Sequence, residues 1–175
     1  GDGDKDVVAT AEANGELLWY ANDGAQQFEL AGIIDADFFN VHVCELGDID
    51  GDGDTDIIAG ASSYGGMRWY ANEAAGTFGP GTALSTITHI RSIDLHDMDD
   101  DGMMDVVFMG GANTLTTYMI WLRAVGDGEF IVSDALLDSP SSVLRADVGD
   151  VDGDDLPDIV YSSEQKQQAG WVRNL

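Results

Sequence analysis

An acidic loop that leads directly into an apolar strand occurs four times in this chain. The fullest copy is Asp48–Asp56, which runs into Ile57–Ala59. Two more complete copies span Asp97–Asp105 and Asp150–Asp158, and a partial copy, Asp2–Asp6, opens the chain. Four or five carboxylates within nine residues repel one another strongly unless a cation lies among them. The loops are therefore predicted to bind metal, although Asp and Gly are also common in ordinary solvated turns.

The spacing of the acids favours calcium. Ca²⁺ takes about six to eight oxygen ligands, and acids at loop positions 1, 3, 5 and 9 with a backbone carbonyl at position 7 can supply them. Mg²⁺ fits less well because it demands octahedral geometry and keeps its waters. We expect three to four Ca²⁺ ions. The predicted ligands are Asp2, Asp4, Asp6, Asp48, Asp50, Asp52, Asp54, Asp56, Asp97, Asp99, Asp101, Met103, Asp105, Asp150, Asp152, Asp154, Leu156 and Asp158.

Loop position 6 is expected to need a left-handed backbone, which glycine adopts without strain. Gly3, Gly53 and Gly102 occupy that position, whereas the last copy has Asp155. Aspartate tolerates this conformation at some cost. The fourth site is therefore expected to be weaker or distorted.

Three landmarks repeat along the chain with a common period. Loop position 5 falls at Asp2, Asp52, Asp101 and Asp154, in steps of 50, 49 and 53 residues. Tryptophan recurs at Trp19, Trp69, Trp121 and Trp171, in steps of 50, 52 and 50. Phenylalanine follows nine residues after the first three, at Phe28, Phe78 and Phe130. Such a period indicates an array of similar supersecondary units.

The pattern of each unit predicts short antiparallel strands. In the first unit, Val7–Ala11 and Leu17–Tyr20 flank Asn14-Gly15, a strong hairpin signal. A further strand precedes each complete acidic loop, at Val41–Leu46, Ile90–Leu95 and Val143–Val148. Four antiparallel strands in about 50 residues describe a propeller blade. The recurring Trp and Phe residues are expected to pack between blades.

The predicted fold is all-β: a single β-propeller segment, residues 1–175, with about three and a half blades. Its repeat units are approximately 1–46, 47–95, 96–148 and 149–175. An open arc of blades leaves sheet edges and faces exposed. We expect other copies of the chain, or the remainder of a longer chain, to complete the propeller.

The loop at Asp48–Asp56 with its Ile57–Gly60 continuation resembles the FG-GAP or VCBS repeat family, whose signature is Asp-x-Asp-x-Asp-Gly-x-x-Asp before an apolar strand. The resemblance implies a bladed propeller in which calcium fixes the loop that enters each innermost strand. Such repeats occur in integrin heads, in bacterial surface and adhesive proteins, and attached to secreted carbohydrate-active enzymes. Asp155 in place of glycine and the truncated first loop depart from the family pattern.

Charge narrows the range of partners. The chain has 7 basic and 33 acidic residues, a net charge of −26. Nucleic acids and anionic membranes both require clusters of Lys and Arg that this sequence lacks, so neither is an expected partner. No apolar run approaches about 18 residues, so no membrane insertion is expected. Loop sites of modest affinity fill where calcium is plentiful, which favours an extracellular, secreted or cell-surface location.

An acid also stands three residues before each complete loop, at Glu45, Asp94 and Asp147. It either supports the loop or occupies a polar position at a sheet edge. We weigh the first interpretation slightly above the second.

Every recurring feature serves fold or metal, and no nucleophile, zinc or phosphate-binding motif is present. We therefore expect a non-catalytic, calcium-stabilised extracellular module for adhesion, for binding a glycan or protein, or for building a surface or filamentous assembly. The alternative is part of a secreted carbohydrate-active enzyme, either a lyase-like propeller or a glycan-binding appendage. Candidate binding loops are Gly110–Thr117, Asp35–Asn40 and Ser162–Gln168.

Overall fold

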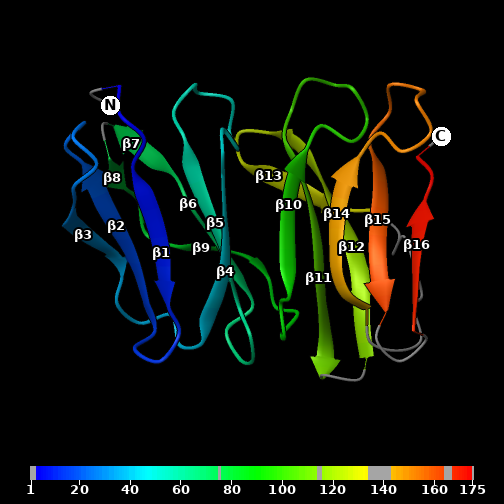
Figure 1. Ribbon diagram of the computed structural model, residues 1–175, viewed down its shortest axis with the longest axis horizontal. Coiled ribbons are helices and arrows are strands. Elements are labelled where there is room, and N and C mark those ends of the chain that lie inside the picture. Colours follow the sequence, from blue (N-terminus) through cyan, green and yellow to red (C-terminus); the bar gives the residue numbers. More distant parts are fainter. Residues whose placement is uncertain (1–2, 75, 114–115, 134–142, 164–166, 175) are drawn as a thin grey trace.

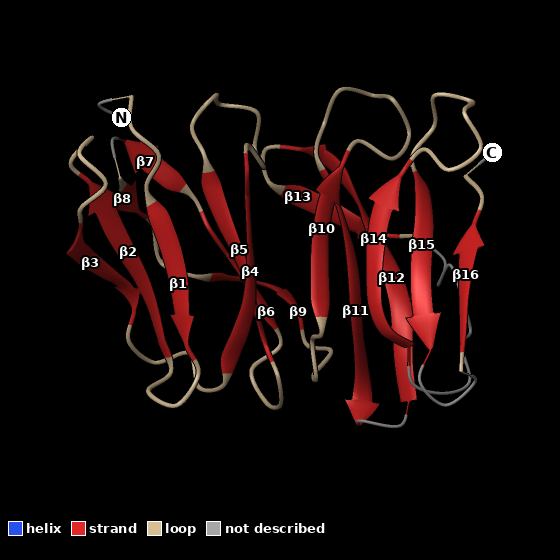
Figure 2. Ribbon diagram, in the orientation of Figure 1, coloured by secondary structure: helices blue, strands red, loops and turns tan. Residues whose placement is uncertain are grey.

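The computed structural model describes residues 3–74, 76–113, 116–133, 143–163 and 167–174, which fold into strands joined by loops (Figures 1 and 2). The strands are β1 (Val7–Ala11), β2 (Glu16–Asn22), β3 (Phe28–Asp35), β4 (Val41–Gly47), β5 (Asp56–Ala61), β6 (Met67–Tyr70), β7 (Asn72–Ala74), β8 (Thr77–Phe78), β9 (Thr82–Ser85), β10 (Ser92–His96), β11 (Asp105–Asn113), β12 (Thr116–Gly126), β13 (Glu129–Val132), β14 (Val143–Gly149), β15 (Asp158–Ser163) and β16 (Gln168–Val172). In this part of the chain no helix is long and apolar enough to cross a membrane.

The strands form four antiparallel sheets, which we call blades one to four. Their strand orders are β1-β2-β3, β4-β5-β6-β9, β10-β11-β12-β13 and β14-β15-β16, and β7 and β8 make a separate hairpin. The blades lie side by side in an open row, and the acidic loops lie along one edge of it (Figure 1). The prediction of an all-β chain built of propeller-like blades is confirmed.

The sheets are offset by one strand from the repeats in the sequence. β4 pairs with β5, so the strand that ends one sequence repeat begins the next blade. Neighbouring blades contact each other through β1, β4, β10 and β14, and each complete acidic loop leaves one of the last three strands. The family resemblance implied a loop entering the innermost strand. In the structure the loop instead joins the first strand of a blade to its second, because Gly47 and Asp56 at its two ends are paired in one ladder.

The hydrophobic core lies between the blades rather than within one of them. All six residues of β5 are buried. Successive residues of a strand point to opposite faces. Ile57 accordingly packs in a cluster with Leu17 of blade one, whereas Ile58 packs in a cluster with Val106 and Phe108 of blade three. The continuous apolar run after the acidic loop is thus what a strand covered on both faces requires.

The recurring aromatic residues join each blade to the next. The Trp19 ring of blade one meets the Phe78 ring edge to face, with centroids 6.4 Å apart and planes at 78°. Phe78 lies in the β7–β8 hairpin, which is inserted between β6 and β9 of blade two. Trp69 of blade two likewise lies against Gly128 and packs in one cluster with Phe130 of blade three. A Cβ atom at Gly128 would lie 2.2 Å from the Trp69 ring, so this position has room only for glycine. The predicted inter-blade packing is confirmed for Trp19, Phe78, Trp69 and Phe130, whereas Phe28 and Trp171 are 48% and 43% exposed.

The segment Asp35–Asn40, one of the candidate binding loops, is anchored between blades one and two by Phe38, and its role as a binding loop stays a prediction. Phe38 is fully buried and lies under the Arg68 guanidinium, 4.2 Å from ring centroid to Cζ. Arg68 and the Tyr70 hydroxyl each donate a hydrogen bond of 2.7 Å to Asp35. Burial raises the pKa of Asp35, but these bonds and one from the Asp37 N–H outweigh it, and the net shift is downward. The other two candidate loops, residues 110–117 and 162–168, lie partly outside the described residues.

The aromatic contact predicts unequal roles for equivalent tryptophans. Trp69→Ala should lower the free energy of unfolding by about 3 kcal/mol, because a large ring is removed from between two blades. Trp171→Ala should cost about 1 kcal/mol or less, since that ring is 43% exposed. Chemical denaturation of both variants in calcium would measure the difference. Equal losses would show that the blade junction does not depend on this ring.

Candidate functional site

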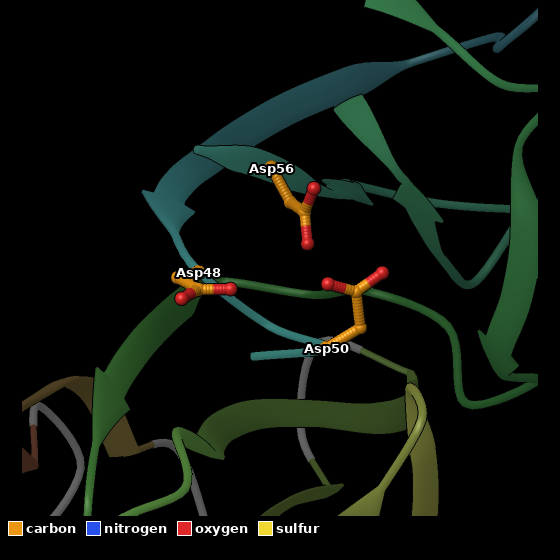
Figure 3. A group of neighbouring side chains, drawn as sticks. All are labelled: Asp48, Asp50 and Asp56. Atoms are coloured by element: carbon orange, nitrogen blue, oxygen red, sulfur yellow. The ribbon is translucent and has the colours of Figure 1, made fainter. Parts of the chain in front are cut away.

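Carboxylates converge in each of the three complete acidic loops. Oxygen atoms within 4.8 Å of one another are offered by Asp48, Asp50 and Asp56, by Asp97, Asp99 and Asp101, and by Asp150, Asp152 and Asp158. Figure 3 shows the first group, in which three side chains from the loop and the start of β5 point toward a common space. Hard carboxylate oxygens are the ligands that Ca²⁺ prefers, so the donor set fits the predicted ion.

The first aspartate of each loop holds the backbone in its turn. Asp48 accepts hydrogen bonds from the N–H groups of Gly51 (2.9 Å) and Gly53 (3.1 Å). Asp97 and Asp150 accept equivalent bonds within their own loops. Both oxygens of each of these carboxylates therefore help to order the loop, while the group still lies beside its acidic neighbours.

Two positions of the loop have left-handed backbone. At position 6, φ is +93° for Gly53 and +67° for Asp155, as the sequence predicts. At position 4, φ is +81° for Gly51 and +58° for Asp100. Sequence reasoning missed position 4, although the glycines at 51 and 153 were a signal for it. The third and fourth loops thus each hold one aspartate in a conformation that glycine would adopt with less strain.

The last aspartate of each complete loop is fully buried at the start of the second strand. Asp56 accepts hydrogen bonds from Ile49 N–H (3.1 Å), from the Trp69 indole N–H (3.1 Å) and from Asn72 N–H (2.8 Å). Asp105 has the same three kinds of partner, with Trp121 as the indole donor. The tryptophans therefore hold the loops in place as well as packing between blades.

This second role of the tryptophans was not predicted, but the sequence carried a signal for it. The distance from the last loop aspartate to the tryptophan is 13 residues in three of the four units, at Asp6 and Trp19, Asp56 and Trp69, and Asp158 and Trp171. The bond from Trp19 to Asp6 is 3.0 Å long. A polar partner spaced as regularly as this is typical of a buried carboxylate that must be hydrogen-bonded.

Burial and neighbouring carboxylates disfavour the ionised form of two of the loop aspartates. Burial raises the pKa of Asp50, and the charges of Asp56, Asp52 and Asp48 raise it further against an opposing bond from Asp52 N–H. Burial also raises the pKa of Asp105. Both shifts mean that the ionised form is unfavourable there, and a bound cation would relieve this cost.

The predicted ligands are brought together only in part. Asp52, Asp54, Asp105 and Asp154 belong to their loops but not to the three-residue groups. Asp4 and Asp6 lie in the partial first loop, and Asp2 lies outside the described residues. A carbonyl ligand at position 7, at Asp4, Asp54, Met103 and Leu156, stays a prediction.

A cleft of about 690 Å³ opens between blades one and two beside the second acidic loop. Trp19 and Phe78 line it on the apolar side, and Lys5, Asp54 and Asn72 contribute polar groups. Its size is within the range of small-molecule sites, and the mixture of aromatic walls with a few polar groups is typical of them. The cleft and the loop share the segment 53–55.

The acids that precede the loops interact with one another across blades. Glu45, Asp94 and Asp147 lie on β4, β10 and β14, the strands through which the blades meet. Burial, then the charge of Asp147, raises the pKa of Glu45. Burial, then the charges of Asp147 and Glu45, raises the pKa of Asp94 to about 6. Of the two interpretations left open by the sequence, these charge interactions favour a polar position at the sheet edge over support of the loops, because β4, β10 and β14 are edge strands of their sheets.

The raised pKa of Asp94 predicts a pH-dependent difference in stability. The folded chain holds this proton more tightly than the unfolded chain, so its stabilising effect is full near pH 4 and is lost as the pH rises through about 6. Asp94→Asn mimics the protonated state and should melt at a higher temperature than the parent at pH 7.5, with the gain vanishing near pH 4. Melting curves across this range, with Glu129→Gln as an exposed control, would test it. A gain that does not change with pH would contradict the assignment.

Comparisons with known proteins agree with this architecture. A lectin of Agrocybe aegerita, whose solved structure concerns specific recognition of non-reducing terminal N-acetylglucosamine, is similar with a TM-score of 0.59 and 21% identity. The match covers 91% of this chain and 47% of the lectin chain, so this chain spans about half the length of that relative. A search of curated proteins found no match. The sequence matches the FG-GAP-like repeat over residues 1–59, 48–108 and 97–161, and the chain therefore belongs to the FG-GAP-like repeat family.

Proposed function

We propose that this chain is a calcium-stabilised, extracellular propeller module that binds glycans. The observation that carries the proposal is the position of the 690 Å³ cleft, which is walled by the aromatic ring of Trp19 and by the second acidic loop. A loop fixed by calcium would thus form part of the wall of a binding site. Loops carried on a rigid framework commonly supply such sites.

Two observations support calcium binding: the set of carboxylate donors, and the energetic cost of leaving these carboxylates without a cation. Asp48, Asp50 and Asp56 bring carboxylate oxygens within 4.8 Å of one another in a chain of net charge −26. When bound, the ion would supply charge neutralisation and a fixed loop shape. Sites of this kind in extracellular modules fill at about 0.1 to 1 mM calcium, which supports a location outside the cell.

A glycan is supported by the chemistry of the cleft. Sugars present apolar faces and many hydroxyl groups, which aromatic rings and charged or amide side chains respectively accommodate. Trp19 and Phe78 provide the rings, and Lys5 and Asp54 provide charged groups. The similar lectin recognises terminal N-acetylglucosamine, so we take this sugar as the first probe.

We further propose that the module is not an enzyme and that additional blades complete the propeller. These blades belong to the remainder of a longer chain or to other copies. The competing function is part of a carbohydrate-active enzyme, because paired carboxylates suited to glycoside chemistry are abundant. Conversion of a polysaccharide by the full-length protein would favour that alternative.

Replacing one loop ligand should separate the effects of metal and charge. Asp50→Asn should lower the free energy of unfolding by about 2 kcal/mol in saturating calcium, since ligand linkage of this size is lost with the site. In chelator the same variant should be as stable as the parent or more so, because one repelling charge is gone. Calorimetry in both buffers, with Glu129→Gln as the charge control, would measure this. Equal losses in the two buffers would contradict a ligand role.

Binding of sugar to the cleft should depend on Lys5. Lys5→Ala should weaken binding of an N-acetylglucosamine-terminated oligosaccharide about tenfold, the usual effect of losing a charged hydrogen bond. Glu16 begins β2, at the end of the strand away from Ala21, which lines the cleft. Glu16→Ala should therefore leave the affinity for the sugar unchanged. Titration followed by NMR in calcium would compare them, with a galactose-terminated sugar as a specificity control. Absence of binding by the parent would remove the glycan from the proposal and leave the calcium sites untouched.

A further inference from the structure

In two of the three complete acidic loops, an arginine from elsewhere in the chain forms ion pairs with the loop carboxylates. We propose that Arg123 and Arg173 are built-in counter-charges that compete with calcium, so that the loops at Asp97–Asp105 and Asp150–Asp158 bind calcium more weakly than the loop at Asp48–Asp56. The inference rests on the calcium part of the proposed function and concerns how the sites differ.

Both arginines contact the acids at loop positions 3 and 5. Arg173 Nε lies 2.7 Å from Asp152 Oδ2, and its Nη2 lies 2.8 Å from Asp154 Oδ2. Arg123 forms the same pair of contacts with Asp99 and Asp101, the latter at 3.3 Å from Nη2 to Oδ2. In each loop one guanidinium thus bridges two carboxylates that are predicted to bind the metal.

The backbone fixes each arginine in this position. Arg123 and Arg173 stand two residues after Trp121 and Trp171. The next residue in each case donates its N–H to the buried last aspartate of the loop: Ala124 to Asp105 at 2.7 Å, and Asn174 to Asp158 at 2.9 Å. The arginine is therefore attached to a backbone segment that is itself tied to the loop.

The second loop offers an internal comparison. The residue two positions after Trp69 is Ala71, and Asn72 N–H makes the equivalent bond to Asp56. Counting acids and the adjacent arginine, the loop at Asp48–Asp56 carries five negative charges and no positive one, a net −5. The other two loops each carry five negative charges and one arginine, a net −4.

This difference has opposite effects with and without calcium. A guanidinium a few ångströms from a divalent ion repels it, and Coulomb's law in a water-like medium puts the loss at about tenfold in affinity at low salt. Without calcium, the same guanidinium offsets repulsion among the carboxylates and helps the loop keep its shape. The third and fourth loops should therefore tolerate low calcium, whereas the second should depend on it.

The test is calcium titration of the intact chain by isothermal calorimetry at low salt, together with melting in calcium and in chelator. Arg123→Gln should tighten calcium binding at the loop Asp97–Asp105 about tenfold, and Arg173→Gln should do the same at the loop Asp150–Asp158. Each variant should also lower the melting temperature in chelator. Arg145→Gln, an exposed arginine on β14, removes the same charge away from the loops and should change neither quantity. Conversely, Ala71→Arg should weaken calcium binding at the loop Asp48–Asp56, the site that we expect to be tightest.

Each outcome decides the proposal. Unchanged or weaker binding in both glutamine variants would overturn it, because the arginines would then be neutral or would help to order the site. If these variants fail to fold, Ala71→Arg gives the answer alone, and an unchanged tightest site would overturn the proposal. If the parent binds no calcium, both this inference and the calcium part of the proposed function fail. If the parent binds calcium but the arginine variants bind it no more tightly, only this inference fails.

Discussion

The structure depends on a buried carboxylate at the start of the second strand of a blade. Asp56 has no exposed surface, yet it is ionisable, and it is held by three N–H donors from three separate places: the loop, an indole and the backbone after the next strand. An unpaired charge in this position would cost several kcal/mol. The hydrogen bonds therefore oblige the loop, the hairpin and the tryptophan to adopt one arrangement together, and the same arrangement recurs in blade three.

Much of this architecture could be predicted from the sequence because its signals are periodic. The spacing of the tryptophans and of the acidic loops gave the number of units, and the apolar run after Asp56 gave a strand covered on both faces. The one-strand offset of the sheets could not be predicted, because it depends on the pairing of Gly47 with Asp56 and not on composition. The bonds of Arg68 to Asp35 join residues 33 positions apart and are equally invisible to local patterns.

The candidate site was predictable to a similar extent. Carboxylates at alternate positions identified the loops, and the structure gathers three from each complete loop. The neutralising arginines escaped notice because they lie about 20 residues from the acids they contact and occur in only two units. The cleft escaped as well, because it is formed by two blades and has no signature within either. Regular features thus define the framework, while departures from regularity distinguish one loop from another.

The packing of Trp19 and Trp69 onto the turn of the following blade has a consequence for how such chains can grow. The ring belongs to one blade and the receiving glycine, Gly76 or Gly128, to the next, so these two junctions each have a donor side and a receiver side. A contact of this kind is heterologous and fixes a rotational direction. Because these two junctions use the same pair of surfaces, a whole unit can be duplicated or deleted between them without creating a mismatched seam, whereas a partial unit cannot. The chain is in this sense directional, because the junction sets the order in which units follow one another and leaves the number of units open.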